Sequence, residues 1–125
     1  MTEEIVNWFR QALGLTQLTP EYLAPEDGAA GLFCRGREVV WQRRDICGCQ
    51  IRRLRLTLLL AMHTAKAPDM DLAEQIDDAL QRFAPTLGLD QTVRLEQARV
   101  VKQEGWGLVR TEARLTFEYT QKEEI

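Results

Sequence analysis

The stretch CQIRRLRLTLLLAMH, residues 49–63, decides how the rest of the chain can fold. Large apolar residues occupy every second position in it, at Leu54, Leu56, Leu58, Leu60 and Met62. A period of two is typical of a β-strand, because successive side chains leave a strand on opposite sides. Arginine and threonine separate the first leucines, and the end of the stretch is apolar on both faces. The pattern predicts a central strand that begins on a half-exposed sheet and ends under cover.

Two segments with helical spacing are predicted to cover a sheet. Residues 2–13 repeat apolar side chains three and four positions apart, and Gly14 follows as a natural stop. Residues 71–84 show the same spacing, and Pro85 ends the pattern. The two apolar stripes consist of Ile5, Trp8, Phe9, Ala12 and Leu13, and of Leu72, Ile76, Ala79, Leu80 and Phe83.

The segment before the central strand is predicted to form a hairpin over residues 31–46. The chain is expected to turn at Arg35-Gly36-Arg37 and again at residues 45–48. Gly48 is interpreted as a bulge, because Ile51 is out of phase with the leucines that follow it.

A long hairpin over residues 91–120 is predicted to close the sheet. The apolar residues of its first arm change phase, so a bulge is expected near Glu96-Gln97. Its turn falls at residues 104–107, and its second arm alternates cleanly between apolar and polar residues. Residues 121–125 are expected to fray.

Together these elements predict one α+β domain over residues 1–125. The sheet is antiparallel with four to five strands, both helices pack on one face, and the order is α-β-β-β-α-β-β. The opposite face is expected to be solvated or to meet a polar partner, since it carries Arg53, Arg55, Arg110, Glu112 and Arg114.

The composition narrows the class of protein. A formal charge of −3, with 45% hydrophobic and 28% charged residues, is typical of a globular domain and argues against tight duplex binding. The sequence contains no run of 18 apolar residues, the length needed to span a membrane, and its acidic start MTEEIVNW does not resemble a secretory signal. Three cysteines, an odd number, favour a reducing cytoplasm over a disulfide framework.

Cysteine and histidine are the residues that invite a metal or catalytic interpretation. Cys47-Gly-Cys49, taken with Cys34 and His63, has one residue between the paired cysteines, whereas zinc signatures usually have two. The sole histidine has no matching serine or cysteine motif, and no glycine-rich phosphate loop is present. We therefore expect no enzyme, no cofactor and no metal, and we interpret the cysteines as half-buried thiols at a turn.

Seven positive charges fall within 21 residues, at Arg35, Arg37, Arg43, Arg44, Arg52, Arg53 and Arg55. Single-stranded nucleic acid could use such a face, with Trp41 as a stacking platform. The net negative charge opposes this interpretation, because such modules are usually basic overall. A small arginine-faced module for an anionic ligand or single-stranded nucleic acid is therefore kept as the alternative function.

The tip of the closing hairpin carries Trp106, a large aromatic residue on a short turn. Such a side chain either folds back over the sheet or docks on a neighbouring molecule. Sheet edges and protruding hairpins are natural places for subunits to join. The candidate subunit or partner interface consists of Trp106, Arg35, Arg37, Trp41 and Arg43.

Four stretches follow one another in a characteristic order: an amphipathic helix, a strong strand directly after a turn, a helix with an acidic start, and an aromatic closing strand. They are EEIVNWFRQALGL (3–15), GCQIRRLRLTLLLAMH (48–63), DLAEQIDDALQRF (71–83) and GLVRTEARLTFEYTQ (107–121). In this order, over residues 3–120, the chain resembles the phage tail terminator and minor capsid (tail completion) proteins.

The resemblance implies a structural protein of the virion, present in the host bacterial cytoplasm during assembly. Members of this family form a ring, commonly a hexamer, that caps the finished tail tube and presents a surface to the head. The implied partners are further copies of the chain, the tail tube protein and a head-completion protein, with no membrane. The family has no catalytic residues or cofactors to carry over. DNA is expected to pass through without specific binding, since a weakly acidic ring does not attract phosphate.

Overall fold

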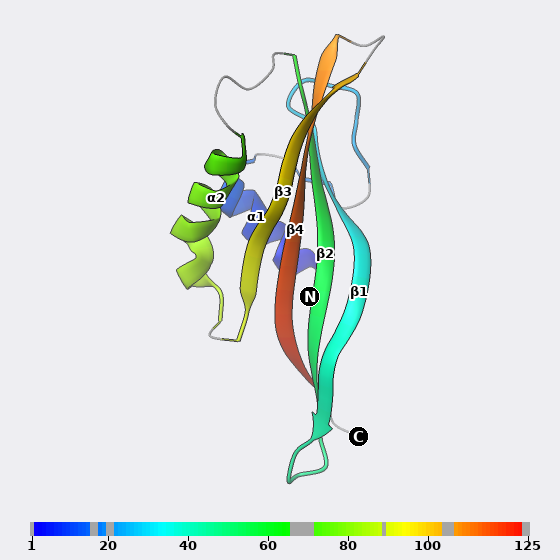
Figure 1. The fold of residues 1–125 in the computed structure, drawn as a ribbon, viewed down its shortest axis with the longest axis vertical. Helices are drawn as coiled ribbons and strands as arrows, with labels where there is room; N and C mark the ends of the chain where they lie inside the picture. Colours follow the sequence, from blue (N-terminus) through cyan, green and yellow to red (C-terminus); the bar gives the residue numbers. More distant parts are fainter. Residues whose placement is uncertain are drawn as a thin grey trace.

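Two helices pack on one face of a four-stranded antiparallel sheet (Figure 1). The computed structural model describes residues 2–15, 18–19, 22–65, 72–88, 90–103 and 107–123. Its elements are α1 (Thr2–Leu13), β1 (Ala30–Arg44), β2 (Gln50–Thr64), α2 (Leu72–Phe83), the 3-10 turn η1 (Ala84–Thr86), β3 (Thr92–Gln103) and β4 (Leu108–Glu123). The strands lie in the order β1-β2-β4-β3, so the predicted α+β class is confirmed with four strands.

The central position of β2 is confirmed, because it pairs along its whole length with β1 on one side and β4 on the other. Leu58 lies opposite Leu115, and Leu54 lies opposite Tyr119. All four side chains are buried. The leucines in alternate positions therefore face the helices, as the period of two predicts.

The core lies between this sheet face and the two helices. Phe9 of α1 is completely buried, and Ile76 and Leu80 of α2 are nearly so. They share one apolar cluster with Leu115 and Phe117 of β4. No helix in the described ranges is long and apolar enough to cross a membrane.

The predicted hairpin over residues 31–46 is wrong, since β1 is one strand with two bulges. Arg35 and Val40 are the extra residues, because the pairing with β2 skips each of them. Gly36 pairs with Thr57 and does not have the positive φ that tight hairpin turns require. The observed order is therefore α-β-β-α-β-β.

The predicted turn at residues 45–48 is confirmed, but Gly48 lies within that turn and not in a strand bulge. Its φ of +82° is a conformation that glycine adopts without steric cost. β2 keeps its alternation from Gln50 onward, so Ile51 simply faces the side of the sheet away from the helices.

The closing hairpin forms as predicted, with the expected bulge at Glu96, which the pairing between Leu95 and Gln97 skips. The second strand runs further than expected. β4 does not fray at residue 121, because Glu123 still pairs with Gln50 of β2.

Candidate functional site

A ladder of ion pairs covers the sheet face away from the helices. Arg55 of β2 contacts Glu118 of β4 and Glu38 of β1, each with a nitrogen–oxygen distance of 2.6 Å. Arg53 reaches the second oxygen of Glu118 at 3.4 Å. These arginines are therefore neutralised by carboxylates of the same sheet and have little free charge for an anionic ligand.

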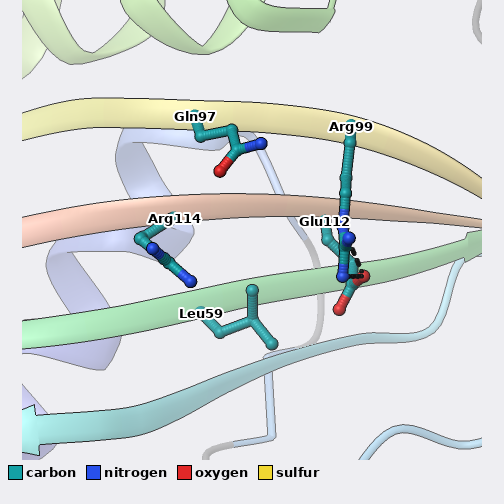
Figure 2. A pocket seen from close by; sticks show the side chains of 5 residues that line it. All are labelled: Leu59, Gln97, Arg99, Glu112 and Arg114. Carbon is teal, nitrogen blue, oxygen red and sulfur yellow. Dashed lines mark hydrogen bonds and ion pairs between the residues drawn. The ribbon is translucent and has the colours of Figure 1, made fainter.

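A second group of charges surrounds a shallow hollow of about 100 Å³ on the same face (Figure 2). One carboxylate oxygen of Glu112 lies 2.9 Å from a guanidinium nitrogen of Arg99, and the other lies 3.5 Å from a guanidinium nitrogen of Arg110. Figure 2 shows Arg114 and Leu59 beside this pair, with Arg114 making no hydrogen bond to the other lining residues. The hollow thus combines the exposed Arg114 guanidinium with an Arg99–Glu112 pair that is already neutralised.

The hydrogen bond from Arg55 lowers the pKa of Glu118, and the charges of Arg55 and Arg53 lower it further. A carboxylate with a depressed folded-state pKa stabilises the fold above its unfolded pKa of about 4.3, and this stabilisation is lost as the pH falls through the folded value. The contribution of these ion pairs to the stability of the fold is therefore expected to decrease in acid.

Replacing Glu118 with glutamine is expected to lower the free energy of unfolding by about 1–2 kcal/mol at pH 7. The effect is at the low end for a charged pair because Arg55 is 39% exposed and screened by solvent. Urea unfolding followed by circular dichroism at pH 7 and at pH 3 measures it. The gap between wild type and Glu118→Gln should narrow between pH 7 and pH 3, because the pH then falls below the unfolded pKa of about 4.3 and the stabilisation begins to be lost.

Glu74→Gln is the matched control, since Glu74 is an exposed carboxylate on α2. It is expected to change the stability by less than about 0.5 kcal/mol. A gap between wild type and Glu118→Gln that is as large at pH 3 as at pH 7 would contradict the ladder.

The half of the β1–β2 hairpin nearest its turn extends past both helices (Figure 1). We call residues 35–53 the arm. Between Val39 and Trp41 it exposes three consecutive apolar residues, and Ile46 at its turn is fully exposed. β1 is an edge strand, and in the described part of the chain Thr19 alone bridges its free edge, beside Gly31. The arm therefore combines an open strand edge with exposed apolar side chains.

Four of the five predicted interface residues lie along one strand, and their role as an interface stays a prediction. Arg35, Arg37, Trp41 and Arg43 are all exposed on β1. The guanidinium of Arg43 stacks 5.1 Å from the centre of the Trp41 ring. Trp106 lies outside the described residues, so its predicted role stays a prediction.

The turn of the arm is held by Asp45. Its carboxylate accepts the backbone N–H groups of Cys47 at 2.9 Å and Cys49 at 3.0 Å, and it pairs with Lys122 of β4 at 3.1 Å. The hydrogen bond from Lys122 is the main cause that lowers the pKa of Asp45. These contacts fix the turn that presents Ile46 to solvent.

A groove of about 460 Å³ between the end of α1 and α2 was not anticipated from the sequence. Its lining includes Ala12, Leu13, Gln75, Asp78, Ala79 and Phe83. Both alanines belong to the predicted core stripes, and their small size leaves the space open. Alanines at facing helix positions are the signal that could have indicated it, but only once the two helices are known to be neighbours.

The cysteines and His63 do not form a common site. Cys47 and Cys49 lie at the turn of the arm, whereas buried His63 lies at the far end of β2, with Nδ1 2.8 Å from the carbonyl oxygen of Ala24. His63 is fourteen positions from Cys49 along extended chain, roughly 45 Å at about 3.3 Å per residue. Cys34 is exposed in the middle of β1. In the described part of the chain, no three metal-binding side chains cluster.

Comparison with known proteins gives no match, either to a protein-family model or to a curated protein. The features that bear on function are therefore the arm, the groove and the neutralised sheet face.

Proposed function

We propose that this protein is a structural virion-assembly protein of a phage or prophage. It forms a homo-oligomeric ring that caps the tail tube and joins it to the head. The order of its elements and its aromatic closing strand, which resemble those of tail terminator and tail completion proteins, support the proposal. The single observation that carries it is the arm, which projects from the domain and exposes apolar residues along an open strand edge.

An arm of this kind would make a monomeric protein prone to aggregation. Long edge strands with exposed apolar residues promote pairing with other chains, and monomeric proteins usually shorten, charge or cover them. Here Val39, Val40 and Trp41 are consecutive and exposed. Contact with another subunit would remove these residues from water, which supports an assembling protein.

The charge balance also fits a ring around DNA. The chain carries a formal charge of −3, and four arginines of the outer sheet face are paired with carboxylates. Tight DNA binding needs many free Lys and Arg contacts to phosphate. A ring built from this chain would therefore let DNA pass without holding it, with the tail tube protein and a head-completion protein as its neighbours.

The purified protein is expected to assemble into a ring, commonly of six subunits, and to bind the end of a purified tail tube. Light scattering coupled to size-exclusion chromatography measures the mass against the 14.4 kDa subunit, and negative-stain microscopy shows where it binds on tubes. A protein that stays a monomer at high concentration and never binds tubes would contradict the proposal.

The alternative function is an arginine-faced module for single-stranded nucleic acid or another anion. The stacking of Arg43 on exposed Trp41 favours it, since aromatic and guanidinium planes both accept bases. A monomer that binds labelled oligonucleotides with affinity falling steeply as salt rises would favour this function over the ring.

A further inference from the structure

We infer that the tip of the arm of one copy docks in the groove between α1 and α2 of the next copy. The inference rests on the proposed ring and specifies the contact that builds it. It names a donor surface, centred on Ile46, and an acceptor surface, lined by Ala79 and Asp78.

The groove has apolar walls that could accept the exposed Ile46 side chain of another copy. Ile46 is fully exposed on a turn that Asp45 fixes, so it projects without a packing partner in its own subunit. The groove has a volume of about 460 Å³, within the range of protein sites that enclose side chains or small ligands. Leu13, Ala79 and Phe83 supply apolar walls. Docking would bury the branched side chain of Ile46 against these walls.

The charges of the two surfaces are opposite. The β1–β2 hairpin, residues 30–64, contains seven arginines and two acidic residues. Arg53 and Arg55 pair with Glu118 of β4, and a positive excess remains after this carboxylate is counted. The two helices contain five carboxylates and two arginines: Glu3, Glu4, Glu74, Asp77, Asp78, Arg10 and Arg82. Asp78 and Arg82 both line the groove, so the negative charge comes from the helices that surround it. Arg43 and Arg44 lie next to the arm's turn. Complementary charge of this kind orients partners and suppresses incorrect pairing.

The contact must form between copies. The arm extends past the helices of its own subunit (Figure 1), so its tip lies away from the groove that Leu13 and Ala79 of those helices line. Because donor and acceptor are different surfaces, each copy can give one arm and receive another. Such head-to-tail contacts close into a ring when the rotation per subunit divides a full turn.

Two variants separate the two surfaces. Ile46→Asp places a negative charge at the tip of the arm. The double variant Gln75→Arg/Asp78→Arg makes the charge of the groove positive and fills part of its volume with two larger side chains. All three residues are exposed, so the fold and melting temperature should be kept. By light scattering, each variant alone is expected to shift from the ring to the mass of one subunit. Tyr22→Asp is the matched control, since Tyr22 is exposed and lies outside the arm, and it should still form the ring.

An equimolar mixture of the two variants gives the decisive result. The intact arm of the groove variant can enter the intact groove of the arm variant, so the mixture should form a 1:1 dimer and nothing larger. No dimer in the mixture, or a ring that survives Ile46→Asp, would overturn the contact while leaving the ring function in place. A wild-type protein that never assembles would overturn both.

Discussion

Replacing Leu58 with glutamine is expected to lower the free energy of unfolding by roughly 3–5 kcal/mol. Leu58 is 4% exposed and lies opposite Leu115 in the centre of the sheet. The amide would lose its hydrogen bonds to water without gaining partners among the surrounding apolar side chains. Since a domain of this size is typically stable by about 5–15 kcal/mol, urea unfolding should show a large shift of the midpoint or no folded protein.

Leu59→Gln is the matched control, one residue along the same strand. Leu59 faces the opposite side of the sheet, at the shallow hollow beside Arg114. Water reaches this side, so the amide keeps its hydrogen bonds, and the expected change is within about 1 kcal/mol. Equal losses for the two variants would contradict the assignment of the leucines to different faces.

Replacing Phe9 with alanine is expected to cost roughly 3–5 kcal/mol. Phe9 is completely buried and anchors α1 to the core cluster, so its removal leaves a cavity that rigid strands cannot close. Thermal unfolding measures the loss. Because the end of α1 forms one wall of the groove, the same variant is expected to weaken ring assembly.

The stability loss of Phe9→Ala can be compared with that of Trp8→Phe, a substitution at the neighbouring position of α1. Trp8 is only half-buried, and its indole N–H donates to the Thr86 hydroxyl at 2.7 Å. Phenylalanine keeps most of the apolar contact and loses this hydrogen bond, a change of about 0.5–1.5 kcal/mol. If Trp8→Phe proved as costly as Phe9→Ala, the neighbouring tryptophan and not Phe9 would anchor the helix.

Features that depend on local spacing were predicted correctly. The alternation from Leu54 to Met62 identified the central strand and its buried face, because strand geometry alone sends neighbouring side chains to opposite sides. The phase change before Ala98 located the bulge at Glu96 for the same reason. Apolar spacing also placed both helices to within a residue or so of their observed ends.

Features that depend on what lies across the sheet were predicted less well. Gly36 between two arginines suggested a turn, yet pairing with Thr57 keeps β1 extended and moves the irregularity to a bulge at Arg35. The arginines and the tryptophan of the candidate interface all lie exposed on the arm, but they were chosen for their composition and not from any knowledge of the arm, and their role stays a prediction: Arg35, Arg37, Trp41 and Arg43.

Residue order along this chain is enough to identify both helices, the central strand and the closing hairpin, since these follow from contacts a few positions apart. It did not identify β1 as one strand, because that depends on the pairing with β2. The length of the arm, the groove beside Ala79 and the carboxylates that neutralise Arg53 and Arg55 come from segments that meet only when the whole chain packs. Glu118 reaches Arg55 from 63 positions away, because strand pairing and not sequence separation sets which charges become neighbours.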